Sequence, residues 1–332
     1  MSPLEVHRFG ADDTDGTTAL LRLLNLVGAT DSPWEHPWLP DRLATMLREG
    51  WDGEPPAAYL ATVGADPVGF ALLFTSERDN THLGSLWMGI DPAHRRQGHG
   101  SALFQRMVQE TLTAGRTSIM VDGWESEAST AFAARHGLER RSQSIQRRQH
   151  LADLDLALVE KQFDESARAA HDYELVRVLG RTPPELVDGM VALVSAINDA
   201  PTDDLDIEDE VFTPERLAAY ENVQTTGGDR LLRLVARHRV TGELAGHTVV
   251  CVEAQRPAVA HQHDTAVARA HRGHRLGMLL KAGMVLWLAE AEPQVRTVDT
   301  WNAESNEHMI AVNDALGYRV MGRELQFQKS LA

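Results

Sequence analysis

The chain has 332 residues, enough for two domains of ordinary size, and an apolar content of 43% typical of a globular protein. Its net charge of −16 argues against the basic surface that a nucleic-acid partner requires. No signal peptide is visible, the longest apolar run, 278–288, is too short to span a membrane, and the single cysteine, Cys251, excludes an intrachain disulfide, so we expect a cytoplasmic protein without a membrane partner.

The first half of the sequence predicts a mixed α/β domain. Alternating residues predict a strand at 5–9, and leucines at helical spacing predict a helix at 17–27. A second helix at 40–49 begins with a proline, as first helical turns often do. The pattern then predicts strands at 58–63, 68–74, 83–90, 118–121 and 143–149, and helices at 97–112 and 127–136. We expect the strand at 143–149 to close this sheet.

The second half repeats this order of elements. Strands are predicted at 173–179, 231–238, 246–252, 262–268, 297–301 and 326–329, and helices at 184–198, 214–222, 275–288 and 306–316. We therefore expect two domains, at 1–150 and 172–332, joined by a charged linker at 151–171. The predicted fold class is α/β of the α+β type, with two similar domains. In each, helices flank a mixed, mostly antiparallel sheet. The protein is expected to be a monomer or a homodimer.

One motif occurs in both halves, each time between a predicted strand and a predicted helix. Residues 93–100 read AHRRQGHG, and residues 270–277 read AHRGHRLG. This arrangement points backbone N–H groups and a helix N-terminus at an anion, usually a phosphate. A dinucleotide fingerprint requires a third glycine and follows a first strand, and a Walker loop requires a G-K-[ST] ending. Neither copy has these features, so both motifs are excluded.

The remaining pattern resembles the GNAT superfamily of acyl-CoA-dependent N-acyltransferases. In the first half it consists of Ile90-Asp91-Pro92 with Arg95-x-x-Gly98-x-Gly100, followed by Ala131-Phe132 and Gly137-Leu138. In the second half it runs from Val267 to Gly277, followed by Asn306, Met309 and Leu316-Gly317-Tyr318. The resemblance covers nearly the whole chain and implies a tandem GNAT protein that uses acetyl-CoA, or another acyl-CoA, as cosubstrate.

The resemblance implies a set of coenzyme contacts in each half. Ser101 can add a hydroxyl to the first phosphate site, whereas Arg275 replaces a loop glycine in the second, so we expect weaker binding there. The implied residues of the first half are Met88, Ile90, Arg95, Arg96, Gln97, Gly98, His99, Gly100, Ser101 and Ser126. Those of the second half are Val267, Arg272, Gly273, His274, Arg275, Leu276, Gly277, Asn302 and Asn306.

The catalytic residues are less evident. Family members often use a tyrosine as general acid, seven residues after an asparagine in the last helix, but here Ala133 and Asn313 occupy the two positions. Asn313 itself, with His82 and Asp264 as possible proton relays, forms the candidate catalytic set. Glu77 and Asp122 are further carboxylates for which a surface role is the simpler interpretation. The histidines lack the spacing of a zinc site, so no metal is expected.

Two functions from different classes remain open. The leading hypothesis is an N-acetyltransferase that acts by direct transfer on a primary amine of a small molecule, such as an antibiotic or another secondary metabolite. The alternative is an acyl-CoA-binding or regulatory protein with little or no turnover. The acidic surface favours a cationic acceptor. The acidic run at 203–210 is expected to be a solvated loop, with a lip over a cationic substrate as the alternative.

Overall fold

A computed structural model describes residues 3–331 and divides the chain into two compact units. The first unit comprises Met1–Ser144, Thr202–Asp209 and Gly322–Ala332, and the second comprises Ile145–Pro201 and Glu210–Met321. Each unit is therefore assembled from segments that are distant in the sequence. Both have a mixed, mostly antiparallel sheet flanked by helices, so the predicted fold class is confirmed.

The first unit contains the elements that the amino-terminal pattern predicts. Its strands are β1 (Leu4–Phe9), β2 (Ala57–Val63), β3 (Asp66–Thr75), β4 (Leu83–Ile90), β5 (Ser118–Trp124) and the end of β12 (Tyr318–Ser330). Its helices are α1 (Thr14–Asp31), α2 (Pro40–Glu49), α3 (His99–Thr113) and α4 (Glu127–His136), with a short 3-10 turn, η1 (Pro92–His94). The strands lie in the order β1-β2-β3-β4-β5-β12, and only β4 and β5 pair in parallel.

Each face of this sheet has its own apolar core. Leu20, Leu23 and Leu24 of α1 pack with Leu43 of α2 and with Phe70 of β3 on one face. The opposite face packs against α3 and α4 through a second cluster, to which Leu103, Phe104, Met107, Ile119, Val121, Leu325 and Phe327 belong. The alternation of strand side chains therefore separates a face covered by α1 and α2 from a face covered by α3 and α4.

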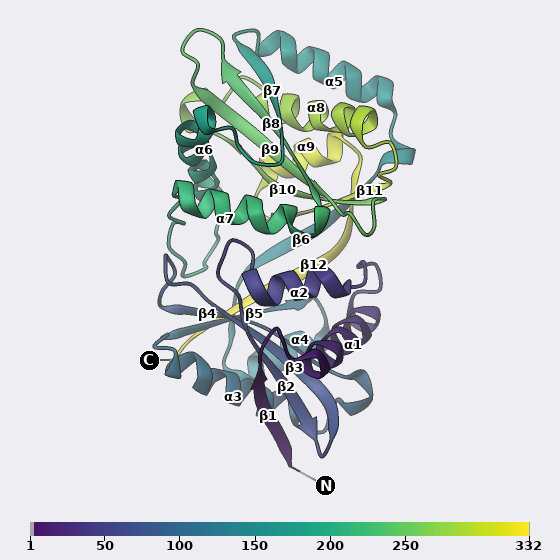
Figure 1. Ribbon diagram of the computed structural model, residues 1–332, viewed down its shortest axis with the longest axis vertical. Helices are drawn as coiled ribbons and strands as arrows, with labels where there is room; N and C mark the ends of the chain where they lie inside the picture. Colours follow the sequence, from purple (N-terminus) through teal and green to yellow (C-terminus); the bar gives the residue numbers. More distant parts are fainter. Residues whose placement is uncertain (1–2, 332) are drawn as a thin grey trace. The chain divides into compact units, whose positions relative to one another are not determined.

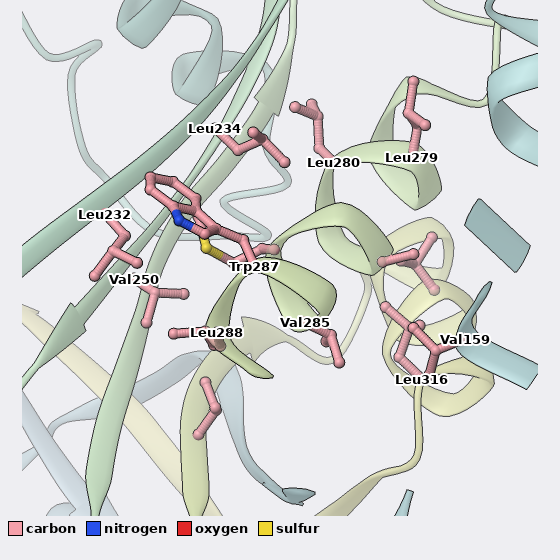
Figure 2. Close-up of a cluster of buried hydrophobic side chains, with 14 of the residues drawn as sticks. Val159, Leu232, Leu234, Val250, Leu279, Leu280, Val285, Trp287, Leu288 and Leu316 are labelled. Atoms are coloured by element: carbon pink, nitrogen blue, oxygen red, sulfur yellow. The ribbon is translucent and has the colours of Figure 1, made fainter. Parts of the chain in front are cut away.

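The second unit has the same plan. Its strands are β7 (Tyr173–Leu179), β8 (Arg230–His238), β9 (Leu244–Val252), β10 (Val259–Val267), β11 (Thr297–Ala303) and the second part of β6 (Glu139–His150). Its helices are α5 (Leu156–Ala169), α6 (Val187–Val194), α7 (Pro214–Thr225), α8 (Leu276–Ala291) and α9 (Glu307–Ala315). Figure 2 shows the main core, where Leu280 and Trp287 of α8 meet Leu232 and Val250 of the sheet.

The final strands of the two sheets are exchanged relative to the prediction. The strand expected to close the first sheet, β6, lies beside β11 in the second unit. The last strand of the chain, β12 (yellow in Figure 1), pairs antiparallel with β5 of the first unit from Glu324↔Trp124 to Ser330↔Ser118. Local alternation predicts both strands correctly but does not encode which sheet a strand joins.

The predicted linker at 151–171 is mostly the helix α5 and belongs to the second unit. Val159 is buried in the main core, and Phe163 packs against it, so this amphipathic helix covers α8 instead of spanning solvent. The predicted helix at 184–198 is also divided, because α6 is flanked by two 3-10 segments, η3 (Pro184–Leu186) and η4 (Ser195–Asp199). Among residues 3–331, no helix is both long and apolar enough to cross a membrane.

The exchange of β12 can be tested with a cavity variant. Phe327 is 6% exposed in the core of the first unit, so Phe327→Ala should lower the free energy of unfolding of that unit by about 3–5 kcal/mol. Hydrogen exchange followed by mass spectrometry should show faster exchange in β5. In the same strand, Val320 is 43% exposed, and Val320→Ala should have little effect. Loss of protection in β11 but not in β5 would contradict this assignment.

Candidate functional site

The first of the two repeated loops follows β4 and is held by its leading arginine. The Arg95 guanidinium donates two hydrogen bonds of 2.7 Å to the Asp31 carboxylate at the end of α1. Its Nε also donates to the Ile90 carbonyl at 3.0 Å. A bidentate pair of this kind fixes orientation as well as charge. Arg95 therefore positions the loop, because its donors are directed at protein groups.

The same loop presents an uncapped helix N-terminus. Two residues adopt the left-handed conformation, Arg96 at φ 62° and Gly98 at φ 88°, and Gly98 is the N-cap of α3. No side chain caps α3, whereas α1, α4, α5, α7 and α9 each have a side-chain cap. The first N–H groups of α3 have no intrahelical acceptor, and the helix dipole adds positive potential there. This geometry suits a phosphate.

Two further residues of the first loop lie close to α4. A Cβ atom at Gly100 would meet only Phe132 and Ile90, at 3.6 and 3.7 Å, and His99 is buried. The Ser101 hydroxyl lies 3.0 Å from Nε2 of His136, and burial is the main cause that lowers the pKa of this histidine. Ser101 is thus already hydrogen-bonded within the protein. Arg96, Gln97 and Gly98 remain exposed.

The strands beside this loop separate at their ends. The parallel pairing of β4 with β5 runs from Leu83↔Ser118 to Leu86↔Val121 and then stops, although β4 continues to Ile90. The edge of β4 that would face β5, from Trp87 onward, therefore has no strand partner there. Met88 and Ile90, two of the predicted coenzyme contacts, lie in this separated segment. Unpaired backbone N–H groups at such a position can bind a carbonyl oxygen.

The second loop reproduces the arginine contact. Arg272 donates from Nε to the Val267 carbonyl at 3.1 Å and from Nη2 to Asp199 at 2.7 Å. Arg269 also pairs with Asp199, and hydrogen bonds from the two arginines lower the pKa of this carboxyl group. Asp199 ends the segment that follows α6, much as Asp31 ends α1. The two units thus hold their loops by the same chemistry.

The backbone of the second loop also matches the first. Gly273 at φ 86° and Arg275 at φ 58° are left-handed, and Arg275 is the N-cap of α8, again without a side-chain cap. Arg275 thus adopts the conformation that Gly98 has in the first unit. Its exposed side chain extends toward Glu165 of α5, 4.0 Å away. Gly277, the counterpart of Gly100, is buried, and a Cβ there would lie 3.8 Å from His308.

Asn313, which occupies the position of the family's tyrosine in the second unit, belongs to a chain of buried, hydrogen-bonded polar side chains. The fully buried Asn313 accepts a hydrogen bond from Lys281 Nζ at 2.5 Å and donates to Asn302 Oδ1 at 2.6 Å. Lys281 also lies over the Tyr318 ring, 4.6 Å from its centroid, and burial lowers the lysine's pKa to about 7. The predicted catalytic candidate Asn313 is therefore part of a satisfied network.

The predicted relay Asp264 lies where β10 leaves its neighbours. The parallel pairing of β10 with β11 ends at His261↔Asp299, and the register with β9 shifts between Gln262 and Thr265. Burial raises the pKa of Asp264, while the nearby Arg233 opposes the increase. The adjacent His263 accepts or donates a 2.6 Å hydrogen bond with the Tyr220 hydroxyl. Asp264 is thus close to the strand separation of the second unit.

The structure places the third candidate, His82, far from the loop. It precedes the first residue of β4, whereas the loop follows the last. At about 3.3 Å per residue, the length of β4 separates the two. The ring instead lies 3.1 Å from the Asp206 carbonyl, in the acidic segment Thr202–Asp209. A role for His82 at the loop is therefore not supported by its position.

The side chains of the acidic segment are exposed, but its backbone forms hydrogen bonds with side chains of the first unit. The amide of Asp206 donates to Gln328, whose side chain donates back to the Asp206 carbonyl. Asn80 exchanges three hydrogen bonds with Glu208. The side chains of this segment are mostly exposed, as predicted for a solvated loop. Its backbone, however, is hydrogen-bonded to β12 and to the turn before β4.

Two predicted coenzyme contacts are helix caps. Ser126 forms a capping box with Ser129 at the start of α4, and Asn306 accepts from the Met309 amide at the start of α9. The predicted carboxylate Glu77 is paired with Arg116. Within the part of the chain that the structure describes, no group of three or more His, Cys, Asp or Glu side chains could hold a metal ion.

Sequence reasoning did not identify several residues of these sites. Asp31 and Asp199 are distant in sequence from the loops they hold, and Lys281 resembles any other residue of an apolar helix. The duplication offered one signal, because an aspartate ends α1 in the first half and the 3-10 segment after α6 in the second.

Comparisons with known proteins agree with this geometry. Residues 23–138 match the model of the Acetyltransferase (GNAT) family. A mycothiol acetyltransferase of Stackebrandtia nassauensis is 33% identical over 122 residues, which are 35% of this chain and 38% of that protein. One of Gordonia bronchialis is 29% identical over 170 residues, which are 46% of this chain and 54% of that protein. The chain thus spans about four tenths and about half of the curated relatives it matches.

Solved structures extend the likeness to the whole chain. A tandem GNAT protein from the clavulanic acid biosynthesis pathway, determined without AcCoA, is 26% identical, with a TM-score of 0.81 and 99% of each chain covered. A GCN5-related N-acetyltransferase from Sphaerobacter thermophilus has a TM-score of 0.67 at 16% identity, covering 100% of this chain and 97% of that one. Both units of this chain have a loop at an uncapped helix end beside separated strands. Residues 23–138 thus match the GNAT acetyltransferase family, and the whole chain is similar in structure to a tandem GNAT protein.

The left-handed arginine gives a testable difference between the loops. Because an L-residue in this conformation costs about 1–2 kcal/mol, Arg275→Gly should raise the stability of the second unit by roughly 1 kcal/mol. The neighbouring His274 is not left-handed, so His274→Gly should instead lower the stability. Urea unfolding of the two variants measures both effects. Equal effects of the two substitutions would show that Arg275 is not strained.

Proposed function

We propose that the first unit transfers an acetyl group from acetyl-CoA to a primary amine of a small molecule. The observation that supports this most strongly is the uncapped, left-handed loop of α3 beside the separated ends of β4 and β5. The loop suits the pyrophosphate, and the unpaired edge of β4 suits the pantetheine and the thioester carbonyl. The family match at 23–138 covers this same unit.

The transfer proceeds without a covalent enzyme intermediate. The neutral amine attacks the thioester carbon, and N–H groups of β4 stabilise the negative charge that develops on the carbonyl oxygen. When the C–S bond breaks, the thiolate of coenzyme A leaves and the amine loses a proton. Because Ala133 occupies the place of the expected tyrosine, a water or another residue returns a proton to the thiolate. Cys251 is 1% exposed in β9, so it is not a nucleophile in this scheme.

The second unit has diverged toward a supporting role, in which it does not carry out the transfer itself. Its loop keeps the backbone geometry, but Gly277 is buried and Asn313 is hydrogen-bonded on both sides. We infer that it binds the coenzyme more weakly than the first unit or not at all. This half of the chain therefore contributes little or no turnover.

The acceptor is proposed to be a cationic small molecule of secondary metabolism, encountered in the cytoplasm by a monomer or homodimer. The net charge of −16 favours a positively charged partner. Two relatives are named mycothiol acetyltransferase, and the tandem neighbour is named as a protein of the clavulanic acid biosynthesis pathway. These names support a small-molecule acceptor.

Coenzyme binding can be tested with a matched pair of glycines. Gly98 and Gly115 both have positive φ and open space around the missing Cβ, and they lie near opposite ends of α3. Gly98→Asp places a carboxylate against the proposed pyrophosphate site, so acetyl-CoA affinity measured by calorimetry should fall by about tenfold or more. Gly115→Asp should leave the affinity unchanged. Equal affinity in both variants would remove this loop from the proposal.

The direct mechanism predicts that the cysteine is dispensable. Cys251→Ala should retain the rate of thiol release from acetyl-CoA in the presence of an acceptor, because the thiol is buried away from both loops. Mass spectrometry of the enzyme after incubation with acetyl-CoA alone should show no covalent acetyl group. An acetyl-enzyme that disappears in Cys251→Ala would replace the direct scheme with a two-step one.

A further inference from the structure

Polar side chains gather on one face of the second sheet, beneath α7. Arg233 of β8 is opposite Val249 of β9, and His247 lies two residues before Val249 on the same strand. Val249 belongs to a small buried cluster against which Tyr220 of α7 packs. Because side chains alternate between the two faces of a sheet, His247 and Arg233 share this helix-covered face with Val249.

Asp264 joins these residues from the irregular part of β10. The register of β10 with β9 shifts between Gln262 and Thr265. The preceding residue, His263, is hydrogen-bonded to the Tyr220 hydroxyl at 2.6 Å. Burial, and next the charge of Asp264, raise the pKa of Tyr220, so Asp264 also lies near α7. Asp264 is partly exposed, and the polar face can therefore be reached from solvent at this point.

His247 is the deepest of these side chains and has no hydrogen-bond partner. It is 1% exposed, and neither of its ring nitrogens forms a hydrogen bond within residues 3–331. Burial, and next the charge of Arg233, lower the pKa of His247 to about 3. The ring is therefore neutral, with one N–H donor and one acceptor nitrogen. Burying both without partners destabilises the folded protein.

The two charged residues of this face differ in how they are held. Arg233 donates from Nη1 to Glu221 at 2.5 Å and to Thr182 at 2.6 Å, so its charge is compensated. The Asp264 carboxylate, in contrast, forms no hydrogen bond or ion pair with any residue of 3–331. Burial raises the pKa of Asp264, and Arg233 opposes this only through its charge. One negative charge of the face is therefore left uncompensated.

The duplication shows that His247 and Asp264 occupy neighbouring positions. On β3 and on β9, a glycine is opposite the last residue of β4 or β10. The residue after this glycine is Phe70 in the first unit and His247 in the second. Trp87 and Asp264 each lie three positions before the end of their strands. In the first unit the two equivalent rings pack 5.8 Å apart.

The first unit also shows that the fold does not require polar groups at these positions. Phe70 is fully buried in an apolar cluster with Leu20 and Leu23, and Trp87 packs against that cluster. An aromatic ring at this point of the sheet therefore completes a core. The second unit instead has an imidazole and a carboxylate that the protein leaves without hydrogen bonds. This exchange of packing for unpaired polar groups points to a ligand.

The unpaired groups define the chemistry of that ligand. An ammonium group compensates the charge of Asp264, but it has donors only. A hydroxyl both donates and accepts, as the neutral His247 ring does. The carbon atoms that join the two groups would contact Val249, which lies on the same face. Among residues 3–331, no group of three or more His, Cys, Asp or Glu side chains could hold a metal ion, which favours an organic cation.

We propose that the second unit binds a small 1,2-amino alcohol on this face, with the ammonium group at Asp264 and the hydroxyl at His247. The ligand is bound and released unchanged, so the site involves no group transfer. It gives a ligand to the unit to which we assign a supporting role. The proposal does not depend on the acyl transfer proposed for the first unit.

Nitrogen NMR of the full-length protein with labelled histidine tests this site. The variant His247→Phe, which copies the first unit, identifies the His247 signals by their absence. We expect ethanolamine to shift both ring-nitrogen signals of His247. Ethylamine and ethylene glycol each lack one of the two groups and should bind about tenfold more weakly or worse. Asp264→Asn should weaken ethanolamine by about tenfold or more.

A matched control and a stability measurement separate binding from structure. Asp172 is an exposed acid of the same unit, and Asp172→Asn should leave the affinity for ethanolamine unchanged. Because His247→Phe and His247→Leu replace unpaired polar atoms with apolar ones, at least one of them should raise the melting temperature by about 2–4 °C while abolishing ethanolamine binding. A lower melting temperature in both variants would show that the histidine is structural.

The remaining outcomes are equally decisive. If the His247 signals show hydrogen-bonded nitrogens in the protein alone and do not move with ethanolamine, water occupies the site and the proposal is wrong. Equal affinities for ethanolamine and ethylamine would overturn the contact between His247 and a hydroxyl. Because no coenzyme is present in these titrations, their failure would leave the coenzyme loop of the first unit unaffected, and failure of that loop to bind acetyl-CoA would leave this site unaffected.

Discussion

The backbone pairing of β5 with β12 is the interaction on which the first unit depends. It completes a sheet whose other five strands come from the amino-terminal part of the chain. It adds Leu325 and Phe327 to the core on the α3 and α4 face. On the opposite face it sets Glu324 diagonally to Asp122. The loop proposed to bind the coenzyme therefore comes from the first hundred residues, whereas the strand segment that completes its sheet comes from the last eleven.

Duplication has conserved the loops and altered what surrounds them. Each loop has two left-handed residues, one glycine and one arginine, in opposite order: Arg96 and Gly98 in the first, Gly273 and Arg275 in the second. Each leading arginine is held by an aspartate and by the last carbonyl of its strand. The two units differ in the charge of the side chains near the ends of these strands. The first unit has carboxylates where its strands separate, and the second has an asparagine network tied to a buried lysine.

The parts of this structure that local patterns determine could be predicted from the sequence. Spacing of apolar residues places α2, β4, α4 and β7 at their observed bounds, and the repeated glycine motif predicts both loops. The exchange of β6 and β12 could not be predicted, because a strand with the same alternation fits either sheet. The charged composition of 151–171 suggests a linker, but its apolar stripe, including Val159 and Phe163, makes it a helix of the second core.

The residues that position the loops and set the charge of the sites come from segments that are distant in the sequence. Asp31 is 64 positions from Arg95, and nothing in its own neighbourhood marks it as a partner. Glu324 becomes notable only when β12 is beside β5, since its burial and its neighbours follow from that pairing. His82 shows the opposite case. It is next to β4 in the sequence, but it lies at the end of that strand remote from the loop.

A crystal structure of the protein with coenzyme A tests the account most directly. The account predicts a pyrophosphate at the amides of 98–101 in the first unit, with the thiol between β4 and β5. Coenzyme bound only to the second unit, or bound to the first with its thiol directed away from the separated ends of β4 and β5, would contradict it.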